Sequence, residues 1–153
     1  MPVDIYIKRE FKGINCRDSK IVKLVKAVCR RYKIKNILIS IAVVDSRKIK
    51  ILNLKFLRRK KNTDCLSFDL SLPKDKTKIF DIIVNGQLAC KEAVKRGHSP
   101  QAELMLYITH GLLHNLGFDD HNTKDARKMH TLEDKILLQH GFGKIYDSNN
   151  IIF

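Results

Sequence analysis

The first half of the chain carries apolar positions in patterns that predict strands and helices in alternation. Residues 3–8 alternate loosely between apolar and polar side chains, which predicts a strand. Residues 37–44 form a short apolar run rich in Ile and Val, which predicts a strand that is buried on both faces. Apolar residues at helical spacing predict helices at residues 19–31, with Ser19 as the N-cap, and at residues 46–57.

The second half predicts a pair of strands followed by helices. Alternation predicts strands at residues 65–70 and 79–85, with residues 74–78 as an exposed link between them. The expected helices are residues 87–96, ended by Gly97, residues 100–116, ended by Gly117, and a last helix that Asn122 and Asp125 cap and that reaches Gln139 before Gly141. Helices that flank a small mixed β-sheet indicate an α+β fold.

Length and composition fit one globular domain. The chain has 153 residues, of which 44% are apolar and 30% charged, without repeats or linkers, so we expect a single domain over residues 1–153. The longest apolar stretch, residues 37–44, is far shorter than the roughly 18 residues of a membrane span. The scattered cysteines are Cys16, Cys29, Cys65 and Cys90. Because they form no close pairs and the start lacks a signal-peptide layout, we expect a cytoplasmic protein.

The charge balance is strongly basic. Thirty Lys and Arg against sixteen Asp and Glu give a net charge of +14 and a pI near 9.8. Such an excess favours polyanionic partners such as nucleic acids, because binding releases counterions from the phosphates. A solvated basic surface is an equally compatible interpretation. A dense run of cations follows the helix expected at residues 46–57, and it consists of Arg58, Arg59, Lys60 and Lys61.

Histidines late in the chain are the strongest chemical signal. His110 and His114 are four positions apart on the helix expected at residues 100–116, so their imidazoles share one face and can converge on one ion. Gly117 ends that helix, and the turn after it can return His121 to the same place. Three protein ligands with a fourth position open are typical of catalytic zinc. We therefore predict one zinc ion per chain, held by His110, His114 and His121.

The residue after the first histidine distinguishes this chain from zinc peptidases. A zincin peptidase has a glutamate there, the general base of the pattern His-Glu-x-x-His. This chain has Gly111 instead, which cannot accept a proton. The sequence therefore predicts a zincin-like metal helix without the usual peptidase base.

The histidine segment is one of three sequence blocks that together resemble a known family. Residues 110–121 are similar to the signature His-Gly-x-Leu-His-Leu-x-Gly-Tyr-Asp-His. Residues 52–68 contain Leu-Asn, an aromatic residue and then Thr-Asp-Cys-Leu-Ser-Phe, similar to a second block, and residues 80–85 are similar to Gly-Asp-Ile-Val-Ile-Ser. In this order the blocks resemble the YbeY family of single-strand-specific endoribonucleases.

The resemblance implies a metal-dependent hydrolase that cleaves single-stranded RNA. It implies a role in rRNA maturation, at the 16S rRNA 3′ end, and in ribosome quality control. An rRNA precursor and the ribosome or its small subunit are then the expected partners, with no DNA and no membrane. It also implies catalytic roles for Arg58, at the phosphate, and for His114, at the zinc. The residues expected to bind RNA are Arg58, Arg59, Lys60 and Lys61.

The chain departs from the family pattern at two places that concern the site. One extra residue after the second histidine puts Asp120 where the family has a histidine. Asp also binds zinc, so Asp120 is the alternative to His121, although a turn easily absorbs one residue. The family arginine aligns with Leu57, so we expect Arg58, one position later, to act at the phosphate, with Arg59 as the alternative.

Two other functions are compatible with these residues. Another zinc hydrolase, such as a metallopeptidase, would keep the histidines, but Gly111 argues against a peptidase. A ribosome-associated RNA-binding module with a structural zinc would keep the charge, but structural sites usually have four ligands. Attack by water and attack by the ribose 2′-hydroxyl both stay open, and the sequence does not predict the oligomeric state.

Overall fold

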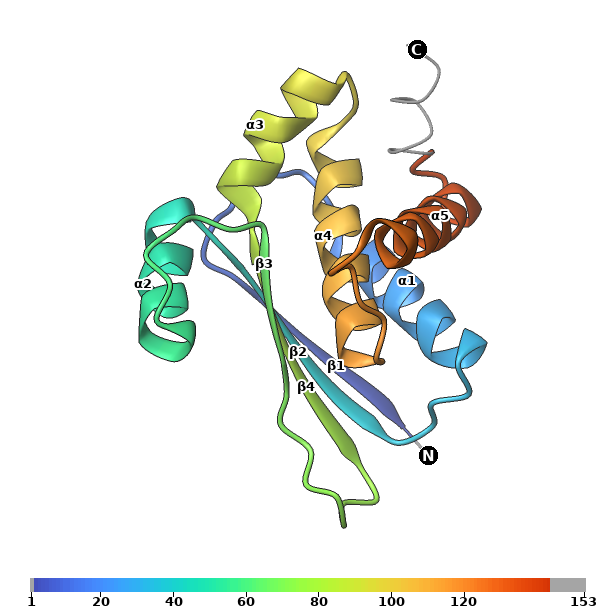
Figure 1. Cartoon of the computed structure of the whole chain (residues 1–153). Helices are drawn as coiled ribbons and strands as arrows, with labels where there is room; N and C mark the ends of the chain where they lie inside the picture. Colours follow the sequence, from blue (N-terminus) through green and yellow to red (C-terminus); the bar gives the residue numbers. More distant parts are fainter. Residues whose placement is uncertain (1, 144–153) are drawn as a thin grey trace.

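The computed structural model describes residues 2–143 as a β-sheet covered by helices (Figure 1). The strands are β1 (Val3–Arg9), β2 (Ile37–Val44), β3 (Cys65–Asp69) and β4 (Lys78–Asn85). The helices are α1 (Asp18–Arg31), α2 (Ser46–Leu57), α3 (Gly86–Arg96), α4 (Pro100–Asn115) and α5 (Thr123–Gln139). Each lies where the sequence pattern predicts an element. Within residues 2–143, no helix is long and apolar enough to cross a membrane.

The sheet is mixed, as predicted. Its strands lie in the order β1-β2-β4-β3. β1, β2 and β4 are parallel, whereas β3 is antiparallel to β4 and forms one edge. The combination of this sheet with flanking helices confirms the α+β fold.

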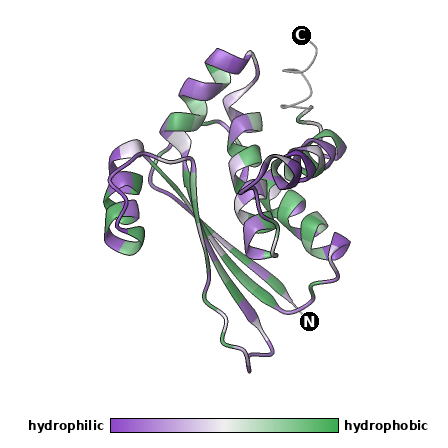
Figure 2. Cartoon of the chain, in the orientation of Figure 1, coloured by the Kyte–Doolittle hydropathy of each residue, from purple (hydrophilic) through white to green (hydrophobic). Residues whose placement is uncertain are grey.

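Helices cover the two faces of the sheet unequally. On one face, α1 and α4 pack on the inward residues of the parallel strands, among them the fully buried Ile39 and Ile82, and α5 packs on α4 within the same core. On the other face, α2 forms a smaller core around Ile49. Figure 1 shows α2 on the opposite side of the sheet from α4 and α5, and Figure 2 shows that apolar residues dominate the strands between them.

The prediction that β2 is buried on both faces is wrong. Its residues alternate, with Ile39 and Ile41 buried under the helices and Leu38 and Ser40 only half-buried on the other face. Leu38 and Ser40 lie outside the smaller core that α2 forms. The continuous apolar run therefore reflects the preference of branched side chains for strands as well as burial.

The helix ends confirm the capping signals late in the chain. Gly97 ends α3 with a φ of 73°, a left-handed conformation that glycine adopts without steric cost. Asn122 begins α5, where its side-chain oxygen accepts a hydrogen bond from the backbone N–H of Asp125 at 2.8 Å. This cap fixes where the turn after α4 ends.

The start of α1 differs from the prediction. Ser19 lies inside the helix, and Arg17 occupies the N-cap position without a side-chain capping hydrogen bond. Asp18, in the first turn, instead accepts a hydrogen bond from Nε of Arg9 at 2.8 Å. The helix start is therefore stabilised by an ion pair with the end of β1 rather than by a serine cap.

Candidate metal centre

The C-terminal half of α4 carries two histidines that face each other. Because His110 and His114 are four residues apart, both imidazoles project from one side of the helix. Their Nε2 atoms lie 3.0 Å apart. The side chains are 17% and 29% exposed. The structure thus brings the first two predicted ligands together at a partly open surface.

Acceptors hold the other ring nitrogen of each histidine. Nδ1 of His114 lies 3.1 Å from the backbone oxygen of Phe118, in the turn after α4. Nδ1 of His110 lies 2.9 Å from Oε2 of Glu133 on α5. A carbonyl oxygen only accepts hydrogen bonds, so Nδ1 of His114 donates and its Nε2 carries a lone pair. The carboxylate of Glu133 favours the same tautomer for His110, which leaves both Nε2 atoms as metal ligands.

Asp120 completes a group of three ligand atoms. Its Oδ2 lies 3.6 Å from Nε2 of His110 and 3.6 Å from Nε2 of His114. In a tetrahedral zinc site with bonds of roughly 2.0–2.1 Å, ligand atoms are about 3.3 Å apart. The distances of 3.0 and 3.6 Å between the ligand atoms lie on either side of that value. Three electron-rich atoms that converge in this way fit one metal ion.

The third predicted histidine lies elsewhere in the turn. His121 is 86% exposed, and its Nε2 is 3.2 Å from Oδ1 of Asp119 rather than beside the histidine pair. Asp119, Asp120 and His121 are within ligand distance of one another, on a more exposed side of the turn. The extra residue in the turn thus gives the place beside His110 and His114 to Asp120. The identity of the third ligand stays a prediction, which these distances favour for Asp120.

Glu133 is the site residue that sequence reasoning missed. Its side chain is fully buried, and its second carboxylate oxygen, Oε1, has no hydrogen-bond partner within residues 2–143. Burial raises the pKa of Glu133 even though His110 lowers it. Burial lowers the pKa of His110, but the hydrogen bond that its Nδ1–H donates to Glu133 and the charges of Glu133, Asp64 and Asp120 outweigh burial and raise this pKa. The carboxylates around His110 therefore favour its protonated, positively charged form.

A sequence signal for Glu133 exists. Met129, Glu133 and Ile136 follow one another at helical spacing on α5, and the two apolar members are buried. A carboxylate on an apolar helix face requires a polar partner, because an unpaired buried charge is costly. The helical pattern alone therefore places a charged residue in contact with another polar group of the core.

Gly111 allows α4 to approach the sheet closely. A Cβ atom at this position would lie 2.8 Å from Sγ of Cys65 and 3.0 Å from Cγ2 of Ile82. The residue after His110 is thus directed at the core and away from the metal ligands. A glutamate here could not serve as a general base without displacing the helix. Steric crowding therefore excludes a peptidase base at this position, in addition to the inability of glycine to accept a proton.

The predicted RNA-binding run lies on an exposed loop after α2. The run consists of Arg58, Arg59, Lys60 and Lys61, all exposed. Asn62, the residue directly after the run, is held by Asn85 at the end of β4, whose Nδ2 donates to Oδ1 of Asn62 at 3.0 Å. The loop ends at Asp64, whose charge raises the pKa of His110. Within residues 2–143, no hydrogen bond or ion pair joins the run to the metal ligands, so its role stays a prediction.

His98 and the four cysteines lie outside the centre. Nε2 of His98 is 2.6 Å from Oε1 of the buried Glu103, at the junction of α3 and α4. The four cysteines are free. Burial raises the pKa of Cys29 to about 11, which keeps its sulfur in the thiol form at neutral pH. These residues contribute to packing and to internal polar pairs rather than to the metal centre.

Known proteins match this chain over most of its length. A family model described as Endoribonuclease YbeY matches residues 6–141. An endoribonuclease YbeY from Buchnera aphidicola subsp. Schizaphis graminum is 35% identical over 142 residues, which cover 86% of this chain and 89% of the relative. Another from Syntrophomonas wolfei is 34% identical over 128 residues, which cover 76% of this chain and 82% of the relative.

A solved structure has a similar fold. The solution structure of TM1509 from Thermotoga maritima superposes with a TM-score of 0.58 at 22% identity. The superposition covers 88% of this chain and 90% of that one. At this level of identity the likeness concerns the fold alone, and it agrees with the mixed sheet and its helices.

Proposed function

The chain belongs to the endoribonuclease YbeY family, and from that membership we propose that it hydrolyses phosphodiester bonds of single-stranded RNA with the help of a metal ion. One observation carries the proposal: Nε2 of His110, Nε2 of His114 and Oδ2 of Asp120 lie 3.0–3.6 Å from one another. Three protein ligands leave one coordination position open, as catalytic zinc sites require.

Zinc is the metal that we propose, one ion per chain. Imidazole nitrogen and carboxylate oxygen are both common zinc ligands. His110, His114 and Asp120 would hold the ion, with His121 as the alternative to Asp120. A bound zinc ion supplies Lewis acidity at a phosphoryl oxygen and lowers the pKa of a water molecule.

The surrounding residues orient the histidines for this role. Glu133 and the backbone oxygen of Phe118 occupy the two Nδ1–H groups, so the Nε2 lone pairs of His110 and His114 are directed at one point. An acceptor on Nδ1 also makes an imidazole a more basic ligand. His114, the more exposed of the pair, is the one that we place next to the RNA as a catalytic residue.

We propose that Arg58 stabilises the charge that builds up on the phosphate, with Arg59 as the alternative. A guanidinium group presents paired donors that match paired phosphoryl oxygens. Lys60 and Lys61 would bind neighbouring phosphates. Supporting this, all four cations are exposed and none forms an ion pair in the part of the chain that the structure describes. The loop also ends at Asp64, whose charge raises the pKa of His110.

The RNA that we propose is an rRNA precursor at its 16S rRNA 3′ end, met in the cytoplasm at the ribosome or its small subunit. This step rests on the family resemblance and on the net charge of +14, which suits a polyanionic partner.

Two other functions fit the site less well. A zinc peptidase needs a base beside the metal, and Gly111 is directed at the core instead. A structural zinc usually has four protein ligands and a closed site. Here three ligand atoms converge, on side chains that are 17–35% exposed.

Metal analysis combined with RNA cleavage tests the proposal. The purified protein should hold about one zinc, cleave single-stranded RNA, lose this activity with a chelator and regain it with zinc. His114→Ala should abolish cleavage and leave RNA affinity largely intact, because a neutral imidazole adds little to phosphate binding. His140→Ala, at the end of α5, is the matched control and should cleave normally. Undiminished cleavage by His114→Ala would refute the metal-dependent mechanism.

A further inference from the structure

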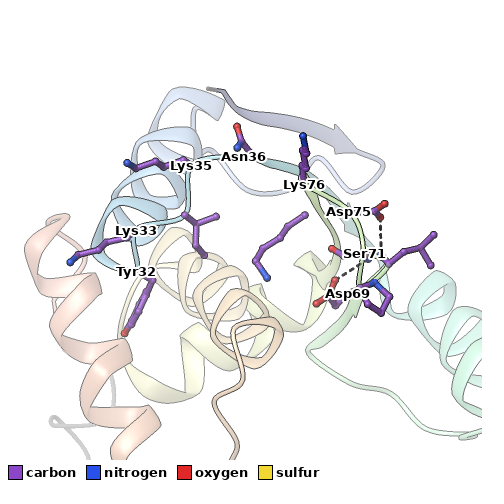
Figure 3. A pocket seen from close by; sticks show the side chains of 12 residues that line it. Tyr32, Lys33, Lys35, Asn36, Asp69, Ser71, Asp75 and Lys76 are labelled. Carbon is purple, nitrogen blue, oxygen red and sulfur yellow. Dashed lines mark hydrogen bonds between the residues drawn. The ribbon is translucent and has the colours of Figure 1, made fainter.

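A pocket of about 580 Å³ lies outside the candidate metal centre. One wall is the connection from α1 to β2, and the opposite wall is the connection from β3 to β4. Figure 3 shows Tyr32 and Lys33 on the first side and Ser71 and Asp75 on the second. In the sheet, Lys78 pairs with the buried Ile37, so the floor continues the face that α1 and α4 cover.

The lining of this pocket is basic. Its lysines are Lys33, Lys35, Lys76 and Lys78, all exposed and without an ion pair in the described part of the chain. Its two carboxylates already accept backbone hydrogen bonds within the β3–β4 connection. Asp69 accepts from Ser71 at 3.0 Å, and Asp75 accepts from Leu72 at 2.8 Å. The excess of cations favours an anionic ligand, and long lysine side chains can adjust to it.

Apolar and aromatic groups lie between these lysines. They are Tyr32, Ile34, Leu72 and Pro73. A volume of this size suits a small molecule or a nucleotide rather than a single ion. Proteins that bind single-stranded nucleic acids combine an aromatic surface for the base with cations for the backbone. The pocket has both components.

Each wall of the pocket is connected by contacts to residues next to His114. The Tyr32 ring lies edge-on to Phe118, with centroids 5.6 Å apart, and the Phe118 oxygen holds Nδ1 of His114. On the other wall, Asn115 follows His114 and donates from Nδ2 to the backbone oxygen of Phe68 in β3 at 3.3 Å. Residues next to the histidine pair thus contact one wall of the pocket directly and, through Phe68, the strand that leads into the other wall.

We propose that the pocket binds a nucleotide of single-stranded RNA outside the cleavage position, with its base against Tyr32 and its flanking phosphates on the rim lysines. The inference rests on the proposed function, since it extends the path of the same substrate. RNA that is long enough to reach both places should bind more tightly than RNA that covers the metal centre alone.

Lys33 permits a test without a loss of folding. It has a φ of 55° after α1, where its N–H bonds to the oxygen of Arg30 and the N–H of Ile34 bonds to the oxygen of Cys29. Glycine is the usual residue in such a helix ending, because lysine is strained there. Lys33→Gly therefore removes the cation and the strain together, and its Tm should equal or exceed that of the native protein.

The experiment measures binding of a fluorescent oligouridylate over a range of salt concentrations. Lys33→Gly and Lys76→Gln, from opposite sides of the pocket, should each raise Kd several-fold. Each should also reduce the magnitude of the negative slope of log affinity against log salt by about 0.7, the value for one phosphate contact on a single strand. In the double variant the two rises in Kd should multiply, and the two changes in slope should add. Lys91→Gln, an exposed lysine on α3 outside the pocket, is the control and should change neither quantity.

The outcomes separate this inference from the proposed function. An unchanged Kd and slope in the double variant, with native cleavage intact, would rule out the pocket and leave the nuclease. An equal loss in Lys91→Gln would mean a generic charge effect and would also rule out the pocket. Absence of cleavage by the native protein would count against the nuclease, while the binding data would still decide the pocket.

Discussion

Nδ1 of His110, on α4, lies 2.9 Å from Oε2 of Glu133, on α5, 23 positions later in the chain. The carboxylate is fully buried, so solvent does not screen its effect on the imidazole. The direction in which His110 presents Nε2 therefore depends on how α5 packs against α4. Metal binding and packing between the two helices are thus physically connected.

Replacing Glu133 with Gln should lower the affinity for zinc and leave the fold intact. The amide oxygen still accepts a hydrogen bond from Nδ1 of His110, but the negative charge that strengthens Nε2 as a ligand is lost. Loss of such an outer partner typically costs about 10- to 100-fold in metal affinity. Competition with a chromophoric zinc chelator measures this affinity. Glu10→Gln makes the same chemical change at an exposed position and should have no effect, and equal affinities in both variants would disprove the role of Glu133.

Asp120→Asn should reduce zinc affinity at least tenfold, whereas His121→Asn should leave it nearly unchanged. The reason is positional: Oδ2 of Asp120 is 3.6 Å from both Nε2 atoms, while His121 is 86% exposed and turned toward Asp119. Asp120→His, which restores the family spacing, should keep the ion. Zinc content after dialysis and competition titration measure these effects. Zinc loss in His121→Asn alone would assign the third ligand to His121.

Local sequence signals predicted the elements well because strands and helix ends depend on neighbouring residues. Gly97 ends α3 and Asn122 begins α5, as expected from their conformational preferences. Pairing of His110 with His114 also follows from helical geometry alone. These features need no knowledge of packing.

The rest of the site depends on tertiary structure. Whether Asp120 or His121 comes closest to the histidine pair is set by the path of a turn, and one extra residue there changes which side chain points inward. The contact between Glu133 and His110 depends on the packing of two helices, for which no spacing rule exists. The partial burial of the second face of β2 likewise depends on how much of the sheet α2 covers.

Gly111→Ala should destabilise the protein although alanine favours helices. The added Cβ would lie 2.8 Å from Sγ of Cys65 and 3.0 Å from Cγ2 of Ile82. Overpacking typically costs about 1–3 kcal/mol, and the helical preference of alanine returns about 1 kcal/mol. We therefore expect a net loss of roughly 1 kcal/mol, or a Tm lower by about 2–4 °C.

Removing the Cys65 sulfur provides the check on this explanation. In a Cys65→Ala background, Gly111→Ala should cost less than in the native protein, since the closest contact is gone. Additive losses in this double-mutant cycle would show that the contact with Cys65 is not the cause.

Gly111→Glu should give no peptidase activity on casein, because the side chain would enter the core rather than the site.

The role of Arg58 is best tested with a residue that tolerates its left-handed backbone conformation. Arg58 has a φ of 55° at the end of α2, where its N–H bonds to the oxygen of Leu54 at 3.1 Å. Arg58→Gly removes the guanidinium and relieves this strain, whereas Arg58→Ala would retain the strain. We expect Arg58→Gly to slow single-turnover RNA cleavage by about 100-fold with a much smaller rise in Kd. The charge on the phosphoryl group is largest in the transition state, so loss of the Arg58 guanidinium affects turnover more than binding.

Neighbouring cations are the controls that decide this prediction. Lys60→Ala and Lys61→Ala should mainly raise Kd and each flatten the salt dependence by about one phosphate contact, because an exposed lysine acts as a point charge. Arg59→Ala removes the same group one position later and should resemble the lysine variants. A selective loss of turnover in Arg59→Ala instead of Arg58→Gly would transfer the catalytic role to Arg59. Parallel losses of binding and turnover in all four variants would make the run a generic basic patch, since only a residue at the scissile phosphate separates the two measurements.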